Sequence, residues 1–553
     1  MKPSEYKISN EKFKFVQEGK VIRDKELSTK PLSYFQDAFN RFKKNKGSIT
    51  AAIIIIILVL FAIIAPIVSP YKVSYTDGYF QYTLPKSNLM YNLGIDFWDG
   101  CSNKEFTKEG FYYHYFMGEE TGHYAIKNQE YEIETKLNNK NQKVDYYKIR
   151  LDSYQLNGVV FKNLSAEEYK ALQEYQNNTG IQVIYPQTVL YLRPSAIQDN
   201  NNANYWYETE AKNGKTSIVL DKNNQVTNIY YKVWTLEEIE EYVASLPDKT
   251  KAEQDYKANM RADLIDVYNF GDDYDSLRIE GEDSDTKYYY AVKNETGYSV
   301  RINYYEYYIY YHTQIVKDGI DEPLFFFGTT NSGQDIFTCL SSGARFSFLL
   351  AICIASVNLI VGAIYGAIEG YYGGKIDLVM ERIVEILSSV PFMIVITLLK
   401  YHMPNTGHAL LLFISFFLTG WISMAGRTRM QFYRFKNQEY VLAARTLGAS
   451  DWRIMFKHIF PNALGTLITS CVLVIPGVIF SETSLSYLGI INLNSGDMTS
   501  VGTLLANGQP FLVSYPHMIL FPALFICLLM LSFNLFGNGL RDAFNPSLRG
   551  AED

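Results

Sequence analysis

The sequence predicts an all-α membrane bundle of six transmembrane helices, with an α+β domain inserted between the first and second helices. Three observations predict this fold class. The sequence has six apolar runs, one long hydrophilic segment follows the first run, and this segment and the rest of the chain have net charges of opposite sign. Residues 72–325 hold 26 Lys and Arg against 40 Asp and Glu, a balance of −14. The rest therefore holds 51 − 26 = 25 basic and 58 − 40 = 18 acidic residues, a balance of +7. Such asymmetry indicates two compartments.

The N-terminal region, residues 1–47, is expected to be cytoplasmic and to carry an amphipathic interfacial helix at about 31–46. Its apolar stripe recurs at helical spacing: Leu32, Phe35, Phe39 and Phe42. A loose cytoplasmic helix is the alternative. The first transmembrane helix follows at 48–70, because about 20 apolar residues are needed to cross a bilayer. This run is too long, and begins too far into the chain, for a signal peptide.

The hydrophilic segment 72–325 is predicted to be an extracytoplasmic α+β domain. Alternating stretches predict two hairpins, one pairing 216–220 with 226–233 and one pairing 287–293 with 299–312. Its one cysteine, Cys101, excludes an internal disulfide framework, so an ordinary core must hold it.

Capping signals predict two helices in the same domain. Ser165 and Glu168 open a helix that ends near Gly180, and Thr235 and Glu238 open another toward Leu246. Of the 45 tyrosines, 34 lie between residues 72 and 325; they favour strands, and they also suit peptide recognition. We favour a scaffold or docking surface over a ligand site.

The core of the membrane bundle, residues 328–549, is expected to contain the other five spans. They are predicted at about 346–368, 383–400, 408–426, 464–487 and 516–536. Six spans put both termini on one side. Basic residues gather in the connections 370–382 and 427–463 and are absent from 401–407 and 488–515. The positive-inside rule therefore predicts a multi-pass protein of the cell membrane with cytoplasmic termini.

Motifs for catalysis are missing from the sequence. It contains no phosphate-binding loop, no zinc-protease motif, no nucleophile elbow and no paired-cysteine metal site. The chain is therefore predicted to be no enzyme and to bind no cofactor or metal. No stretch is basic enough to indicate nucleic acid. Within the spans Glu482 is the candidate for the transport pathway, since ionisable groups in membranes are functional candidates; a hydrogen bond to a neighbouring helix is the alternative.

The cytoplasmic connection at about 427–461 is the most informative segment. A short helix is expected to end at Gly448, which tolerates a left-handed backbone, and a second helix to open at Asp451 and stop at Pro461. Two short helices joined by a glycine turn would fill a groove on a partner. The residues expected to make this contact are Glu439, Ala443, Ala444, Gly448, Ala449, Asp451 and Pro461.

This connection resembles the coupling loop of bacterial binding-protein-dependent ABC importers, whose pattern is E-A-A, three residues, Gly, and Pro thirteen positions on. Ala443, Ala444, Gly448 and Pro461 match it, whereas Leu442 replaces the Glu. Further segments resemble the oligopeptide/dipeptide/nickel permease branch. They are the interfacial helix, Gly370 to Gly374 with Asp377, Ser388 to Pro391 (a bend in the third span), Glu482 with Ser486 to Gly489, and Asn534 with Gly539 to Pro546.

Two departures stand out. The stretch from Gly328 to Phe337 resembles the family's G-T-D-x-x-G-R-D-x-F, but Thr330 and Gln334 replace charged residues. The second departure is the long segment 72–325, where common members have only a short connection.

The resemblance implies the type I ABC importer permease fold and one permease subunit of an ATP-driven importer, with oligopeptides or dipeptides as cargo and nickel or small solutes as the alternative. It implies as partners a homologous permease subunit, two ATP-binding subunits that hold ATP and Mg²⁺, an extracytoplasmic substrate-binding protein, peptide substrate and the lipid bilayer. Two rival classes remain open: an ABC-superfamily exporter or mechanotransmitter with an outer domain, and a receptor that senses a ligand.

Overall fold

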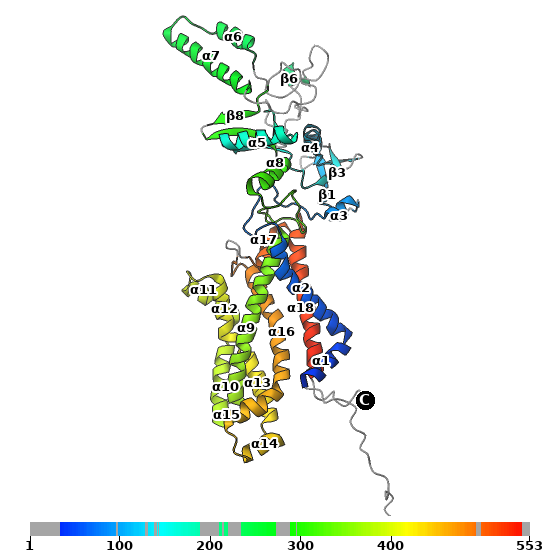
Figure 1. Ribbon diagram of the computed structural model, residues 1–553, viewed down its shortest axis with the longest axis vertical. Helices are drawn as coiled ribbons and strands as arrows, with labels where there is room; N and C mark the ends of the chain where they lie inside the picture. Colours follow the sequence, from blue (N-terminus) through cyan, green and yellow to red (C-terminus); the bar gives the residue numbers. More distant parts are fainter. Residues whose placement is uncertain are drawn as a thin grey trace, which may run out of the picture.

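The computed structural model describes residues 34–93, 95, 98–127, 131–137, 141, 143–187, 209–212, 215–218, 234–272, 288–294, 296–493 and 499–544. They form a bundle of long helices with a separate α+β domain at one end (Figure 1). The domain occupies the chain between the first long helix and the second.

The helices of the bundle are α1 (Tyr34–Lys44), α2 (Lys46–Val68), α9 (Ile336–Tyr372), α10 (Gly374–Ser388), α11 (Phe392–His402), α12 (His408–Gly420), α13 (Ile422–Phe435), α14 (Glu439–Thr446), α15 (Asp451–Arg453), α16 (Phe460–Tyr487), α17 (Val501–Gly508) and α18 (His517–Phe544). A π-helical turn (Ile454–Ile459) joins α15 to α16, and a 3-10 turn (Gln509–Phe511) follows α17.

Five helical stretches are long and apolar enough to cross a membrane, or six if the bent pair α10–α11 is one span. They are Lys46–Val68, Ile336–Tyr372, His408–Phe435, Asp451–Tyr487 and His517–Phe544. Each predicted run overlaps one of these stretches or the bent pair, and all but Lys46–Val68 extend well beyond the predicted run. The extensions are polar turns at the helix ends, which hydropathy alone does not detect.

The third predicted span, 383–400, is bent in the structure. The structure has two helices, α10 and α11, that meet at a 72° bend. The bend follows from Pro391, which lacks an N–H group and whose ring clashes with the preceding turn of a helix. The resemblance had indicated a bend at Ser388 to Pro391. None of the residues of α10 is buried, so this helix lies along the margin of the bundle.

Helix α9 forms the centre of the bundle and packs against α2, α13 and α16. Its contact with α13 depends on small residues. A Cβ atom on Gly366 would lie 2.1 Å from Ala425 O, so only glycine allows the two backbones to approach this closely. The shared core includes Leu340, Ile354 and Leu529.

The α+β domain contains the helices α3 (Asn88–Asn92), α4 (Lys108–Thr121), α5 (Ala166–Thr179), α6 (Leu236–Ser245), α7 (Lys251–Asp272) and α8 (Tyr304–Tyr310), the last followed by a π-helical turn (Tyr311–Val316). Its strands are β1 (Cys101–Thr107), β2 (Glu132–Leu137), β3 (Lys143–Asp152), β4 (Val159–Leu164), β5 (Ile184–Tyr185), β6 (Thr209–Lys212), β7 (Lys215–Ile218), β8 (Ala291–Asn294) and β9 (Gly297–Asn303). All pairs are antiparallel, in sheets ordered β1-β3-β2, β4-β9-β5 with β8 beside β9, and β6-β7.

Both capped helices form as predicted. In α5, Ser165 and Glu168 make a reciprocal capping box, and the helix ends at Gly180 with φ +71°. In α6, Thr235 and Glu238 make the same box, and Leu246 is the C-cap. These signals are local, because each cap satisfies backbone groups within its own turn.

The hairpin predictions are only partly right. Strands β8 and β9 form the hairpin around 294–297, but β9 ends at Asn303, and Tyr304–His312, predicted as strand, is helical. The reason is Asn303, whose side chain accepts a hydrogen bond from Tyr305 N and caps α8. In the other hairpin, β7 overlaps the predicted 216–220 but pairs with β6. The predicted partner, 226–233, lies outside the described residues.

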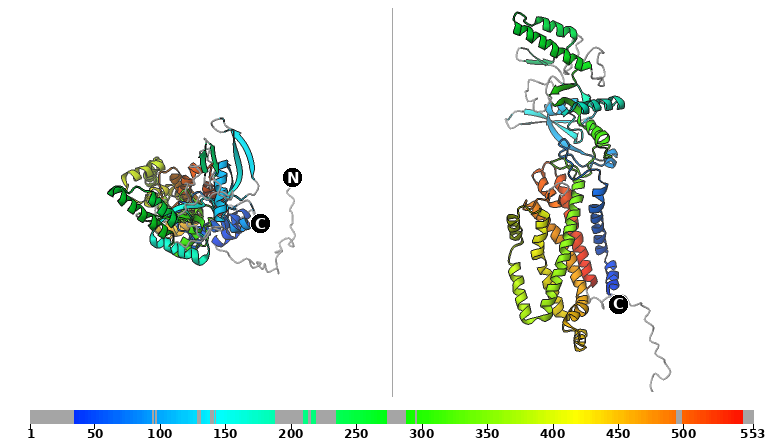
Figure 2. Two further views of the ribbon diagram at one scale, coloured as in Figure 1. Left: turned by 90° about the horizontal axis from the view of Figure 1, so that it is seen from above. Right: turned by 60° about the vertical axis from the view of Figure 1, so that its left-hand side comes forward.

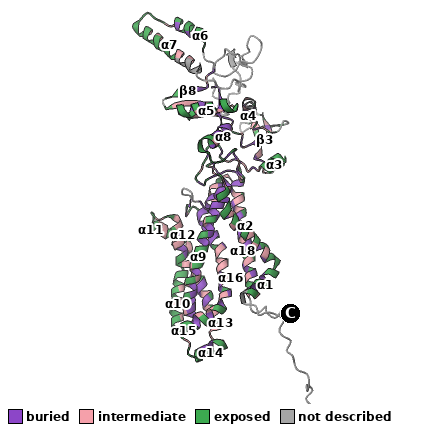
Figure 3. Ribbon diagram, viewed as in Figure 1, coloured by how far each residue is buried: buried purple, intermediate pink, exposed green. Residues whose placement is uncertain are grey.

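Tyrosines and aliphatic residues make up the core of the domain. Tyr154, Tyr169 and Tyr308 are among its largest fully buried side chains, and they pack with Ile302 and Phe325. Figure 3 shows this buried centre between exposed helices. The tyrosine richness of the sequence is thus explained in part by core packing.

The two ends of the bundle differ. The α+β domain covers the end where α2 finishes and α9 begins, whereas α14 lies at the opposite end (Figures 1 and 2). Helix α1 and the end of α18 lie at the α14 end (Figure 1). The sides of α1 and α18 touch: the rings of Phe42 and Phe536 are 5.3 Å apart.

Candidate functional site

The candidate site is the segment from α13 to the start of α16, at the tip of the bundle farthest from the α+β domain (Figure 1). Helix α14 begins at Glu439 and ends at Thr446. Gly448 follows with φ +82°, as its left-handed role required. Ala449 N donates to Ala444 O at 3.1 Å, so the turn closes over the last carbonyls of α14.

One face of the segment is anchored in the bundle. Val441 is 0% exposed and Ala444 8% exposed. Val441 packs with residues of α9, α13 and the π-helical turn: Ala367, Tyr371, Phe432, Ile454, Met455 and Ile459. This small core fixes α14 against the end of the bundle.

A polar contact adds to the anchor. Tyr371, near the end of α9, donates its hydroxyl proton to Asp451 Oδ1 at 2.6 Å. Arg445 lies beside the same ring, with its Nη2 atom 3.4 Å from the Tyr371 hydroxyl. Asp451 thus joins the turn to α9 as well as opening α15.

The other face of the segment is exposed and apolar. Leu447 is 88% exposed, Trp452 60% and Leu442 46%. Glu439 and Ala443 are exposed beside them. We call Leu442, Leu447 and Trp452 the tip patch. Large apolar side chains clustered on a surface mark a site of interaction with another protein or a membrane.

The prediction that Pro461 stops the second helix is wrong. Pro461 lies in the first turn of α16, where its missing N–H leaves no hydrogen bond unmade. The π-helical turn before it changes the hydrogen-bond register. As a result Asp451–Tyr487 is one helical stretch, and the turn after α14 is continuous with a membrane-span candidate.

Arg429 on α13 forms an ion-pair cluster that sequence reasoning did not assemble. Its Nε and Nη2 atoms bind both carboxylate oxygens of Asp377 on α10, at 2.7 and 3.1 Å. Glu381 lies 3.2 Å from Nη1 and Glu369 of α9 lies 3.5 Å from Nε. The cluster holds the otherwise unburied α10 to the bundle. Asp377 had been singled out in sequence, but its partners are distant in the chain.

The structure places Glu482 inside the bundle, at 0% exposure. Ser347 of α9 donates to Glu482 Oε2 at 2.8 Å, and Ser486 donates to Oε1 at 3.2 Å. The geometry in this single chain is that of a helix-to-helix contact. No group of three or more His, Cys, Asp or Glu side chains able to hold a metal ion occurs among the described residues.

Two family models match the chain. They are the binding-protein-dependent transport system inner membrane component, over residues 358–550, and the N-terminal TM domain of oligopeptide transport permease C, over residues 33–85. The two matches leave residues 86–357 between them. Over these residues the chain is similar to inner-membrane components of binding-protein-dependent transport systems.

Curated relatives narrow this class. The oligopeptide transport system permease protein OppC of Bacillus subtilis is 44% identical over 223 residues, which are 40% of this chain and 72% of that protein. The dipeptide transport system permease protein DppC of the same organism is 40% identical, over 40% of this chain and 69% of that protein. OppC of Escherichia coli K12 is 37% identical, over 40% of this chain and 73% of that protein. The chain belongs to the oligopeptide/dipeptide family of ABC transporter permeases.

Proposed function

We propose that this chain is one permease subunit of an ATP-driven importer of oligopeptides or dipeptides. The observation that carries the proposal is the tip patch, which is held rigidly from behind by Val441 and Ala444 and is exposed in front. A partner ATPase that receives this patch would supply the energy, with ATP and Mg²⁺ held by the ATPase. Peptide cargo is supported by the names of the relatives, which are oligopeptide and dipeptide permeases.

The coupling proposed here is mechanical. Because α15, the π-helical turn and α16 are continuous, displacement of α14 by the ATPase would be passed to the fifth span as a rigid-body movement. The contact of Asp451 with Tyr371 would pass the same displacement to α9. A second, homologous permease would complete the pathway. Glu482 would then act by fixing α16 to α9, with a place in the pathway as the competing role.

The proposed topology follows from the two ends of the bundle. If α14 meets a cytoplasmic ATPase, then the α+β domain at the opposite end is extracytoplasmic, and α1 and the end of α18 are cytoplasmic (Figure 1). We propose that the domain is a dock that holds an extracytoplasmic substrate-binding protein above the bundle. The excess of acidic residues between 72 and 325 would favour a basic face on that protein and make association sensitive to salt.

The test substitutes one exposed apolar residue at each end of the bundle. Leu447→Asp in the tip patch should abolish co-purification of the ATPase subunits and peptide uptake, because a charge would enter an apolar contact. The matched control is Val513→Asp, at 96% exposure on the domain side, which should retain both. Leu447→Asp retaining normal ATPase binding and uptake would refute the assignment of the tip patch.

A further inference from the structure

The α+β domain joins the bundle through two chain segments, residues 69–86 and 318–335, that are bonded to each other. Thr329 N donates to Thr83 O at 2.9 Å, and Thr83 N donates to Thr329 Oγ1 at 2.8 Å. Lys86 N donates to Phe325 O at 3.1 Å. The segments therefore form a paired ribbon and not two independent linkers.

One buried tyrosine fastens both segments to the domain. Tyr154, two residues after the end of β3, is 1% exposed. Its hydroxyl donates to Leu84 O at 3.1 Å in the entering segment and accepts from Phe325 N at 3.1 Å in the leaving segment. Ser153 accepts from Leu84 N at 3.0 Å. Loss of these bonds would leave buried backbone groups unsatisfied, which is costly.

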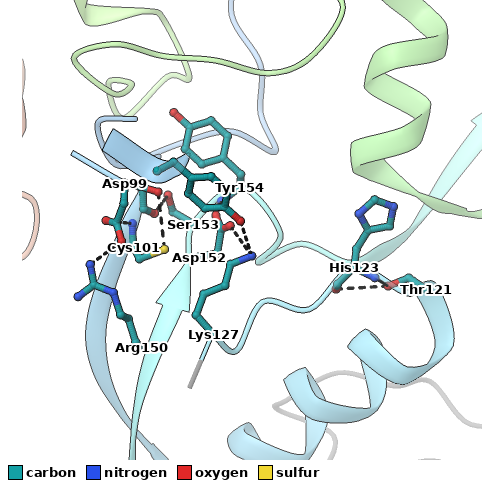
Figure 4. A network of polar contacts seen from close by, with 11 residues as sticks. Asp99, Cys101, Thr121, His123, Lys127, Arg150, Asp152, Ser153 and Tyr154 are labelled. Carbon is teal, nitrogen blue, oxygen red and sulfur yellow. Dashed lines mark hydrogen bonds and ion pairs between the residues drawn. The ribbon is translucent and has the colours of Figure 1, made fainter. Parts of the chain in front are cut away.

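The same strand end is held from behind by ion pairs. Lys127 Nζ lies 3.2 Å from Asp152 Oδ2, and Arg150 lies 2.5 Å from Asp99 Oδ2 (Figure 4). Asp152 also accepts from Tyr154 N at 2.9 Å. Tyr154 is therefore fixed by the sheet as well as by the connecting segments.

Asp77 in the entering segment forms a second tie. It accepts hydrogen bonds from Tyr304 at the start of α8, at 2.8 Å, and from Tyr75, at 3.2 Å. The Tyr75 hydroxyl also lies 3.0 Å from His312 Nε2. Gly333 of the leaving segment, at φ +73°, approaches so closely that a Cβ atom would lie 1.8 Å from Asp77 O. Helix α8 is thereby joined to both segments.

The base of the domain also touches the start of the last span. The ring of Tyr82 stacks on that of Tyr515, with centroids 4.6 Å apart. Trp98 lies 5.3 Å from Phe521 of α18, and His517 Nε2 lies 3.3 Å from Thr329 O. These contacts connect the domain to the start of α18, although the two are far apart in the sequence.

We propose that the sheets β1-β3-β2 and β4-β9-β5, which share the core around Tyr154 and Ile302, move with α5 and α8 as one rigid arm together with the domain-side ends of α2, α9 and α18. This goes beyond the dock proposed above, since a flexibly tethered domain would also hold a partner. A rigid arm would turn with the spans during the transport cycle. By linkage, a partner that prefers one direction of the arm would in turn favour one arrangement of the spans.

The experiment measures a distance within the assembled transporter by double electron–electron resonance. Spin labels replace Lys170, exposed on α5, and Val513, exposed before α18, in a background without the native cysteines. The arm predicts one narrow distance distribution with the same mean in the nucleotide-free and vanadate-trapped states. A broad distribution, or a mean that shifts between the two states, would overturn the proposal.

A pair of variants tests the ties themselves. Tyr154→Phe combined with Tyr304→Phe removes two hydroxyls and should broaden the distribution at least twofold. Tyr256→Phe, on the exposed surface of α7, is the matched control and should leave the width unchanged. An unchanged width of the distance distribution in the double variant would refute the claim that these hydrogen bonds hold the arm rigid. ATPase co-purification from the same samples reports separately on the proposed function and on folding.

Discussion

Gly448 allows the coupling segment to be perturbed without a steric clash. Its φ is +82°, and a Cβ atom built there would meet nothing within 4 Å. A substitution therefore adds backbone strain alone. Left-handed backbone costs an ordinary L residue about 1–2 kcal/mol, and it is least accessible to β-branched residues, whereas Asn adopts it readily.

The expected magnitude follows from that strain. A cost of about 1–2 kcal/mol lowers the population of the native turn about 5- to 30-fold relative to competing turns. Gly448→Val should therefore reduce peptide uptake and peptide-stimulated ATP hydrolysis several-fold while the chain stays in the membrane. Gly448→Asn, of similar size, should keep most of both activities. Equal losses in the two variants would refute the reasoning, because bulk and not backbone conformation would then be responsible.

Three other predictions concern topology, packing and pH. Cysteine in place of Ser217 or Asn294 should react with an impermeant thiol reagent added to intact cells, and cysteine in place of Ser450 or Ser547 should not; labelling at 450 would contradict the six-span topology. Gly366→Leu should prevent close packing of α9 on α13 and reduce the folded yield in membranes, whereas Gly426→Leu, with no atom within 4 Å of its Cβ position, should be tolerated. Burial lowers the pKa of His114 to about 4, so the folded state favours neutral histidine. The contribution of His114 to stability is then full above pH 6.5 and falls by up to roughly 3 kcal/mol as the pH drops toward 4. His114→Phe should remove this pH dependence of stability, measured by proteolysis of the purified protein. The same pH dependence in the variant would contradict this assignment.

Features set by neighbouring residues were predictable from the sequence. The capping boxes at Ser165 and Thr235 and the left-handed turn at Gly448 each depend on a few adjacent backbone groups, and all three form as expected. The apolar runs located the spans for the same reason, although the helix ends extend into polar sequence.

Features set by tertiary contacts were not predictable. Pro461 breaks no helix because the π-helical turn before it shifts the hydrogen-bond register, and no composition signal reveals that turn. Tyr304–His312 alternates like a strand but follows an asparagine cap. The Arg429 cluster joins residues from three helices, and its members stand more than 40 positions apart from Arg429 in the sequence. The hydrogen bonds of the Tyr154 hydroxyl likewise join two connecting segments, at Leu84 and Phe325, that meet only in the fold.

The most direct test of the function is to place a photo-crosslinking residue at position 447 and to identify the protein that it joins in cells. If the tip patch docks into the energy-supplying subunit, irradiation should join this chain to an ATP-binding protein, and the same probe at position 513 should not. Adducts between position 447 and an extracytoplasmic protein, or the same ATP-binding adduct from position 513, would contradict the proposed coupling and orientation.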